Sequence, residues 1–146
     1  MRTKPIVGLL LCLALVGCFK APNNDNRVKP TSGLVVVIVE DETRAEPLTS
    51  GQVVAMGAES VQEYLASHCA KGADGQTPES KKYKKGTDVK LQSESVQKLH
   101  AKVVEKMDKS GSKDPHIGIQ SGRKTAIGPV PEGEQNMLNL LKKYGG

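Results

Sequence analysis

The sequence predicts an α/β fold in which a central mixed β-sheet is flanked by helices. Three observations carry this prediction. Residues 34–39 form a continuous apolar and largely β-branched run, which is typical of a buried strand. Residues 93–111 repeat apolar side chains at helical spacing between a capping Ser93 and a terminating Gly111. Two short apolar segments then flank a Ser121-Gly122 turn, which indicates a β-hairpin.

The first strand, at residues 34–39, is too short for a helix and too apolar for a strand with one wet face, so both of its faces should be covered. A polar segment follows, and then a set of apolar residues at spacings of three and four marks one face of a helix. Gly57 interrupts this pattern and can divide the helix in two. The apolar residues are Val54, Ala58, Val61, Leu65 and Cys69.

The next segment, residues 70–88, is rich in Gly and Lys, and its only strand candidate lies at residues 81–85. The helix of residues 93–111 comes next, and the predicted hairpin pairs residues 116–120 with 123–127. A last helix opens near Pro131, with acids in its first turn and lysines in its last turn, as the helix dipole favours. The predicted order is therefore β-α-β-α-β-β-α.

The start of the chain has the features of a bacterial lipoprotein export signal. Basic residues Arg2 and Lys4 precede an apolar run over residues 6–16, and the run ends at Leu15-Val16-Gly17-Cys18. Eleven residues at roughly 1.5 Å each span only about half of a ~30 Å hydrocarbon core, so the run is not a transmembrane helix. Cleavage between Gly17 and Cys18 would leave Cys18 as the first mature residue, with a diacylglyceryl thioether on its sulfur and a fatty acyl chain such as palmitate on its amine.

This signal divides the chain into residues 1–17 as signal peptide, 18–32 as lipidated N-terminus and tether, and 33–146 as one domain. The tether contains two prolines and several Asn without apolar periodicity, and a coil of this length spans on the order of 20 Å. We expect the protein to be anchored to the cell membrane or outer membrane by lipid at Cys18, facing the periplasm or the exterior. Its other expected partner is an envelope protein.

The charge of the mature chain argues against nucleic-acid binding. The formal net charge of +5 includes Arg2 and Lys4, so the mature side chains carry +3, and the chain has no Trp and only one Phe. Base stacking and a dense basic stripe are therefore missing. The lysines at 81, 82, 84 and 85 indicate a solvated edge strand, or a contact with lipid headgroups.

No enzyme, cofactor or metal motif stands out. His68, His100 and His116 with Cys69 are the only borderline metal ligands, and none has a recognised spacing. Cys69 is the only thiol left free in the mature chain. Its position on an apolar helix face favours a buried structural thiol, while an intermolecular disulfide and a catalytic nucleophile, aided by the nearby His68 and Lys71, are the alternatives.

The order of elements resembles the thioredoxin fold. The matching residues are Asp114-Pro115-His116-Ile117-Gly118-Ile119, then Ser121-Gly122-Arg123, then Ile127-Gly128, and the helix of residues 137–144. The resemblance implies that Pro115 is the counterpart of a cis-proline that faces the active site. It also places the active-site dithiol of such oxidoreductases at the junction of residues 40–47, which contains no Cys here and an excess of acids.

The family's dithiol exchange is therefore excluded, because that mechanism needs a second thiol to resolve the mixed disulfide. We expect Glu40, Asp41, Glu42 and Pro115 to form a binding groove and the domain to act as a redox-inactive binding or scaffolding module. The alternatives are a single-cysteine, thiol-dependent protein using Cys69 and a purely structural envelope lipoprotein.

Overall fold

The computed structural model describes residues 33–145. The predicted export signal, Cys18 and the tether lie outside these described residues. The elements, in chain order, are β1 (Leu34–Glu40), α1 (Ser50–Gly57), α2 (Glu59–His68), β2 (Ser80–Lys84), α3 (Glu94–Ser110), β3 (His116–Ser121), β4 (Lys124–Pro129) and α4 (Glu134–Gly145). None of the helices described is long and apolar enough to cross a bilayer.

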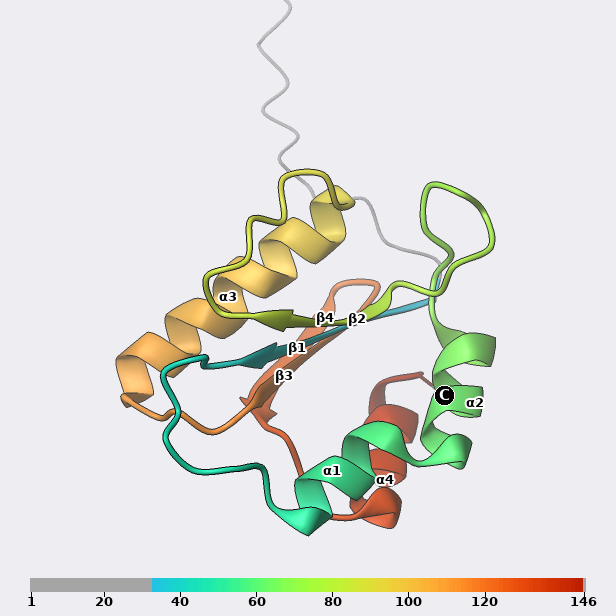
Figure 1. The fold of residues 1–146 in the computed structure, drawn as a ribbon. Helices are drawn as coiled ribbons and strands as arrows, with labels where there is room; N and C mark the ends of the chain where they lie inside the picture. Colours follow the sequence, from blue (N-terminus) through green and yellow to red (C-terminus); the bar gives the residue numbers. More distant parts are fainter. Residues whose placement is uncertain (1–32, 146) are drawn as a thin grey trace, which may run out of the picture.

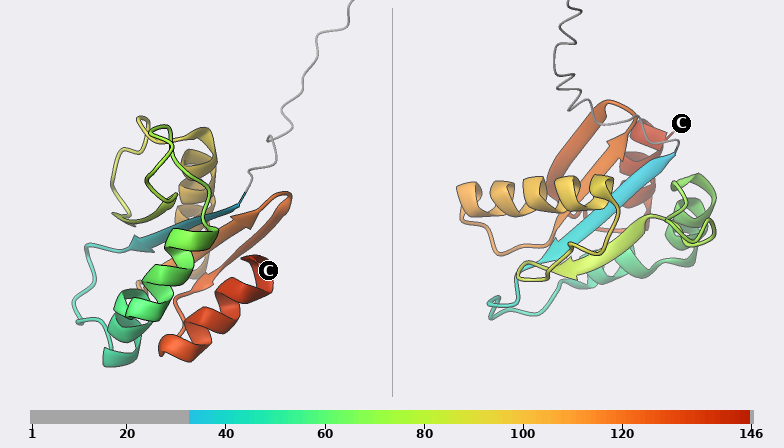
Figure 2. Two further views of the ribbon diagram at one scale, coloured as in Figure 1. Left: turned by 90° about the vertical axis from the view of Figure 1, so that its right-hand side faces the viewer. Right: turned by 90° about the horizontal axis from the view of Figure 1, so that it is seen from above.

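The four strands form one mixed sheet in the order β2-β1-β3-β4 (Figure 1). The β1 and β2 strands are parallel, whereas β3 is antiparallel to both β1 and β4. Helices α1, α2 and α4 cover one face, and α3 lies alone on the other (Figure 2). The predicted α/β fold with a mixed sheet flanked by helices is thus confirmed, including the strand at β2.

Strand β1 supplies side chains to both cores of the domain. Leu34, Val36 and Ile38 pack on the side of α1, α2 and α4, while Val35, Val37 and Val39 pack against α3. This follows from the alternation of side chains along a strand. All six are buried, as expected for a strand covered on both faces.

Helix α3 begins and ends where the sequence predicts. The Ser93 side chain accepts a hydrogen bond from the Val96 amide, and Gly111 ends the helix with φ 64°. The helix passes close over β3 at Gly118, where a Cβ would lie 2.6 Å from Cγ2 of Val103 and 2.9 Å from Cδ1 of Leu99. Glycine at this position lets the helix approach the sheet.

The first predicted helix is indeed divided, but the break alters which residues face the core. Ala58 has extended backbone, φ −59° and ψ 136°, between α1 and α2. This break changes the phase of the helical pattern. As a result Ala55 is buried and Val54 is 47% exposed, so the expectation that Val54 faces the core is wrong.

One expectation about the segment around β3 is also wrong. The Asp114–Pro115 peptide bond is trans, not cis. Pro115 enters β3 in line with the ladder, and its carbonyl accepts a hydrogen bond from the Val130 amide at 2.8 Å, so the strand begins without the minority isomer. His116 is the first residue of β3 in the hairpin and is buried, and its Nδ1 lies 2.8 Å from the Asp114 carbonyl oxygen.

The hairpin itself forms as predicted, with the turn one residue later. Ser121 pairs with Lys124, which leaves Gly122 and Arg123 as the two turn residues. Gly122 has φ 55°, as the first position of a type II′ turn requires.

Candidate functional site

A groove of about 250 Å³ lies at the end of β1, and all four residues predicted to form one contribute to it. It is bounded by the loop after β1, the end of β2 and the segment before β3. These segments meet because the ends of β1 and β2 and the start of β3 lie at the same edge of the sheet. The lining residues are Glu40, Asp41, Glu42, Arg44, Glu46, Pro47, Leu48, Lys84, Lys113 and Pro115.

Asp41 holds the loop in shape rather than facing a ligand. Its Oδ1 accepts hydrogen bonds from the Thr43 amide at 2.8 Å and the Thr43 hydroxyl at 2.7 Å. Lys85 Nζ lies 3.8 Å from its other oxygen and 2.5 Å from Asp108 Oδ1. The hydrogen bonds from the Thr43 hydroxyl and amide lower the pKa of Asp41, and the charges of Lys85 and Lys113 add to this shift.

Arg44 links the groove loop to Asp114 and Gln52, and only 13% of its side chain is exposed. One guanidinium nitrogen lies 3.4 Å from Asp114 Oδ1, and another donates to Gln52 Oε1 at 3.4 Å. Gln52 also completes a reciprocal cap with Thr49 at the start of α1. The shape of the loop is therefore coupled to the first turn of α1 and to the residue before Pro115.

Glu40 is paired, but incompletely. Its Oε1 lies 3.3 Å from Lys82 Nζ, which is an ion pair, yet this buried oxygen has no partner with hydrogen-bond geometry. An unsatisfied buried carboxylate oxygen is costly.

The remaining charged side chains are the ones available to a ligand. Glu42 and Glu46 are exposed and have no ion pair or hydrogen bond with any side chain in residues 33–145, and the same holds for Lys84. Lys113 Nζ donates to the Thr43 carbonyl at 3.5 Å. The groove thus presents two free carboxylates and the free Lys84 ammonium beside an apolar surface made by Pro47 and Pro115.

Sequence reasoning missed Lys84 and Lys113 as groove residues. Lys84 ends the edge strand β2, and Lys113 comes shortly before β3. A predicted strand order would have placed both at this edge, because neighbouring strand ends meet there.

Cys69 is far from the groove along the sheet. It follows α2 and forms a bridge with Leu34, at the opposite end of β1, and it is only 6% exposed. Burial raises the pKa of its thiol to about 11, against the partly opposing charge of Lys71. The geometry favours a structural thiol.

The three histidines are dispersed. His68 stacks on Tyr64 with ring centres 3.9 Å apart, and His100 meets the edge of Tyr83. Burial lowers the pKa of His100, and its Nε2 has no hydrogen-bond partner. Within residues 33–145, no group of three or more His, Cys, Asp or Glu side chains could hold a metal ion.

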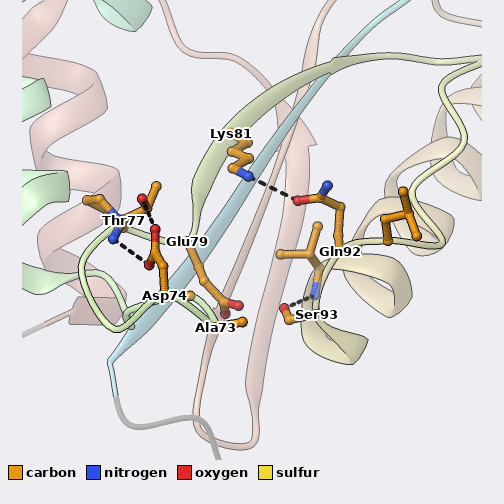
Figure 3. A pocket seen from close by; sticks show the side chains of 11 residues that line it. Ala73, Asp74, Thr77, Glu79, Lys81, Gln92 and Ser93 are labelled. Atoms are coloured by element: carbon orange, nitrogen blue, oxygen red, sulfur yellow. Dashed lines mark hydrogen bonds between the residues drawn. The ribbon is translucent and has the colours of Figure 1, made fainter.

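A second cavity, of about 260 Å³, lies between the loop before β2 and the start of α3 (Figure 3). Most of its polar side chains are engaged with one another. Asp74 accepts from the amide and hydroxyl of Thr77, which help to lower its pKa to about 2, and Lys81 Nζ donates to Gln92 Oε1 at 3.0 Å. This cavity therefore offers a ligand fewer free charges than the groove does.

No protein-family model, curated protein or solved structure compared with the chain matches it.

Proposed function

We propose that the chain is a lipid-anchored, extracytoplasmic protein whose thioredoxin-like domain lacks a redox dithiol and binds an envelope protein through the groove at the end of β1. The observation that carries this proposal is the groove itself. Glu40, Asp41, Glu42 and Pro115 line one cavity at the β1–α1 junction, where the resemblance places the dithiol of thioredoxin-like oxidoreductases. Thiols are missing from this part of the described chain, because Cys69 lies at the other end of β1.

The thioredoxin-like part of the proposal rests on the order of elements. The structure has strand, helices, strand, helix, two strands and helix in sequence, which is the order that carries the resemblance. Because the bond before Pro115 is trans, a cis-proline does not support the resemblance. Lipid attachment at Cys18 rests on the sequence signal.

The chemistry of the groove favours a cationic segment of a protein partner. Glu42 and Glu46 are exposed carboxylates that line the groove. A Lys or Arg side chain would supply both the opposite charge and hydrogen-bond donors to these two carboxylates. Pro47 and Pro115 give the apolar stem of such a side chain a surface to pack against.

Crosslinking in the native envelope tests this proposal. A photoreactive residue replacing exposed Ala45, in the groove loop, should give a discrete crosslinked protein. The matched control is the same residue at exposed Ala101, on α3. Glu42→Gln combined with Glu46→Gln should reduce the Ala45 adduct at least several-fold. Identical adducts from both positions, or an Ala45 adduct that the two glutamate substitutions leave unchanged, would contradict binding through the groove.

The two alternatives make different predictions. A thiol-dependent protein would show catalytic turnover that Cys69→Ser abolishes, whereas we expect no reduction of protein disulfides above background, because a single thiol cannot resolve its own mixed disulfide. A purely structural lipoprotein would alter envelope integrity when deleted and give no groove-dependent adduct.

A further inference from the structure

Four basic side chains gather at the end of the domain opposite the groove. Arg123 and Lys124 come from the β3–β4 hairpin, and Lys142 and Lys143 from the last turn of α4. Ser121 pairs with both Lys124 and Leu34, so the hairpin turn lies beside the start of β1. A Cβ on Gly145 would lie 2.7 Å from Leu34 Cδ1, so α4 ends at the same place. We call these four residues the basic end.

The charges of the basic end are free, unlike those of the other lysine cluster. Arg123, Lys124, Lys142 and Lys143 are exposed, and none has an acidic partner within the described residues. In contrast, the lysine cluster of β2 is partly neutralised by nearby acids. Lys82 pairs with Glu40, and Lys85 pairs with Asp41 and Asp108.

Two acidic side chains lie across β1 from the hairpin turn. Asp74 and Glu79 lie in the segment that leads into β2, on one edge of the sheet. The hairpin turn lies at the β3–β4 side, with β1 between them in the strand order.

An apolar groove adjoins the basic end. It has a volume of about 200 Å³ between β4 and α4, and Ala126, Leu140 and Tyr144 are among its lining residues. Lys143 Nζ lies 5.8 Å from the centre of the Tyr144 ring. A partly buried Tyr beside lysines is suited to the boundary between water and lipid, where amphipathic side chains gather.

The chain also enters the described domain at this end. Gly33 has φ 104°, and a Cβ there would lie 2.7 Å from the Ala70 nitrogen. Ala70 in turn donates to the Leu34 carbonyl at 2.7 Å. Only residues 19–32 separate Gly33 from Cys18 along the sequence, so the basic end is the part of the domain that a lipid anchor would hold closest to the bilayer.

We propose that the basic end docks on the anionic phosphate headgroups of the membrane to which the protein is anchored. This inference rests on the proposed anchor at Cys18. Docking fixes the orientation of the domain, because the seven residues of β1 place the groove roughly 20 Å further from the bilayer. The groove then faces away from the lipid, toward proteins of the compartment.

Vesicle binding by the unacylated chain tests the docking surface independently of the anchor. The chain from residue 18 onward, carrying Cys18→Ser, should bind vesicles of equal parts phosphatidylglycerol and phosphatidylcholine, and should not bind pure phosphatidylcholine. High salt should release it, because the Debye length falls from about 10 Å at 0.1 M to about 3 Å at 1 M. Each cation near an anionic surface contributes roughly five-fold in partitioning.

Two matched variants distinguish an effect of the basic end from an effect of net charge. Arg123→Gln with Lys124→Gln should weaken partitioning roughly twenty-five-fold, as two such steps of about five-fold predict. Lys102→Gln with Lys106→Gln removes the same charge from exposed positions on α3 and should have little effect. Equal losses in both variants, or no salt-sensitive binding to anionic vesicles, would overturn the proposal.

Acyl labelling of the chain with Cys18 intact tests lipid attachment alone. Labelling without vesicle binding by the unacylated chain refutes the docking surface and leaves the anchor standing. Vesicle binding without labelling supports the docking surface and refutes the anchor.

Discussion

The thiol of Cys69 should react with iodoacetamide far more slowly in the folded domain than in the unfolded chain. The thiolate is the reactive species, and burial raises the pKa of Cys69 from 9.0 to about 11. Near pH 8 this shift lowers the thiolate fraction roughly a hundred-fold. Its exposure of 6% hinders the reagent as well, so we expect a native rate at least a hundred-fold below the rate in urea.

The assay uses the chain from residue 18 with Cys18→Ser, in which Cys69 is the sole thiol. Alkylation is followed by intact mass in buffer and in urea over a series of pH values. The native rate should rise about ten-fold per pH unit up to the raised pKa. A native rate within ten-fold of the unfolded rate would refute the burial argument and revive the thiol-dependent alternative.

The raised pKa of Cys69 also makes the stability of the domain depend on pH. A folded-state pKa above the unfolded value favours the protonated thiol, so its contribution is fully present below about pH 9 and is lost as pH rises through about 11. Cys69→Ala should remove this alkaline loss. Denaturant unfolding of both proteins at several pH values measures the difference.

Three further predictions follow from the fold and the sequence. Gly118→Ala should destabilise the domain by about 1–3 kcal/mol, because the added methyl overpacks against α3. Gly128 has open space around it, so Gly128→Ala should be near neutral in thermal unfolding. Equal effects of the two variants would contradict the close approach of α3. Asp41→Asn should reduce the loss of stability at acid pH. The lowered pKa of Asp41 gives stability that is present above pH 3.8 and lost as pH falls through the folded-state value. An unchanged loss of stability at acid pH, measured by urea titrations, would count against the hydrogen bonds to Thr43. Cys18→Ser should leave the precursor uncleaved and without incorporated fatty acid in metabolic labelling, and surviving label would refute the lipid attachment.

The predictable parts of the fold are those that short-range pattern controls. The apolar run of β1, the Ser93 cap and the Gly111 stop each need only neighbouring residues, and the structure has them all. The break at Ala58 changes the phase of a helix, which a continuous apolar pattern does not reveal. The exposure of Val54 follows from that break.

The site was predictable only in part, because it depends on pairing between distant residues. Sequence placed the acidic loop and Pro115 in one groove on the strength of a resemblance. It could not show that Asp41 is engaged by Thr43 while Glu42 is free. Nor could it show that Lys124 and Lys142 share one end of the domain, because strand order and helix packing bring them together.

The pairing of β1 also governs when the domain can fold. The register places Val36 beside Ile119, so the first strand must wait for the last third of the chain to complete its central ladder. Because β1 serves both cores, neither core can form fully before β3 arrives. Such non-local pairing slows folding. For a chain proposed to leave the cytoplasm, this delay keeps the growing polypeptide unfolded until nearly all of it has been made.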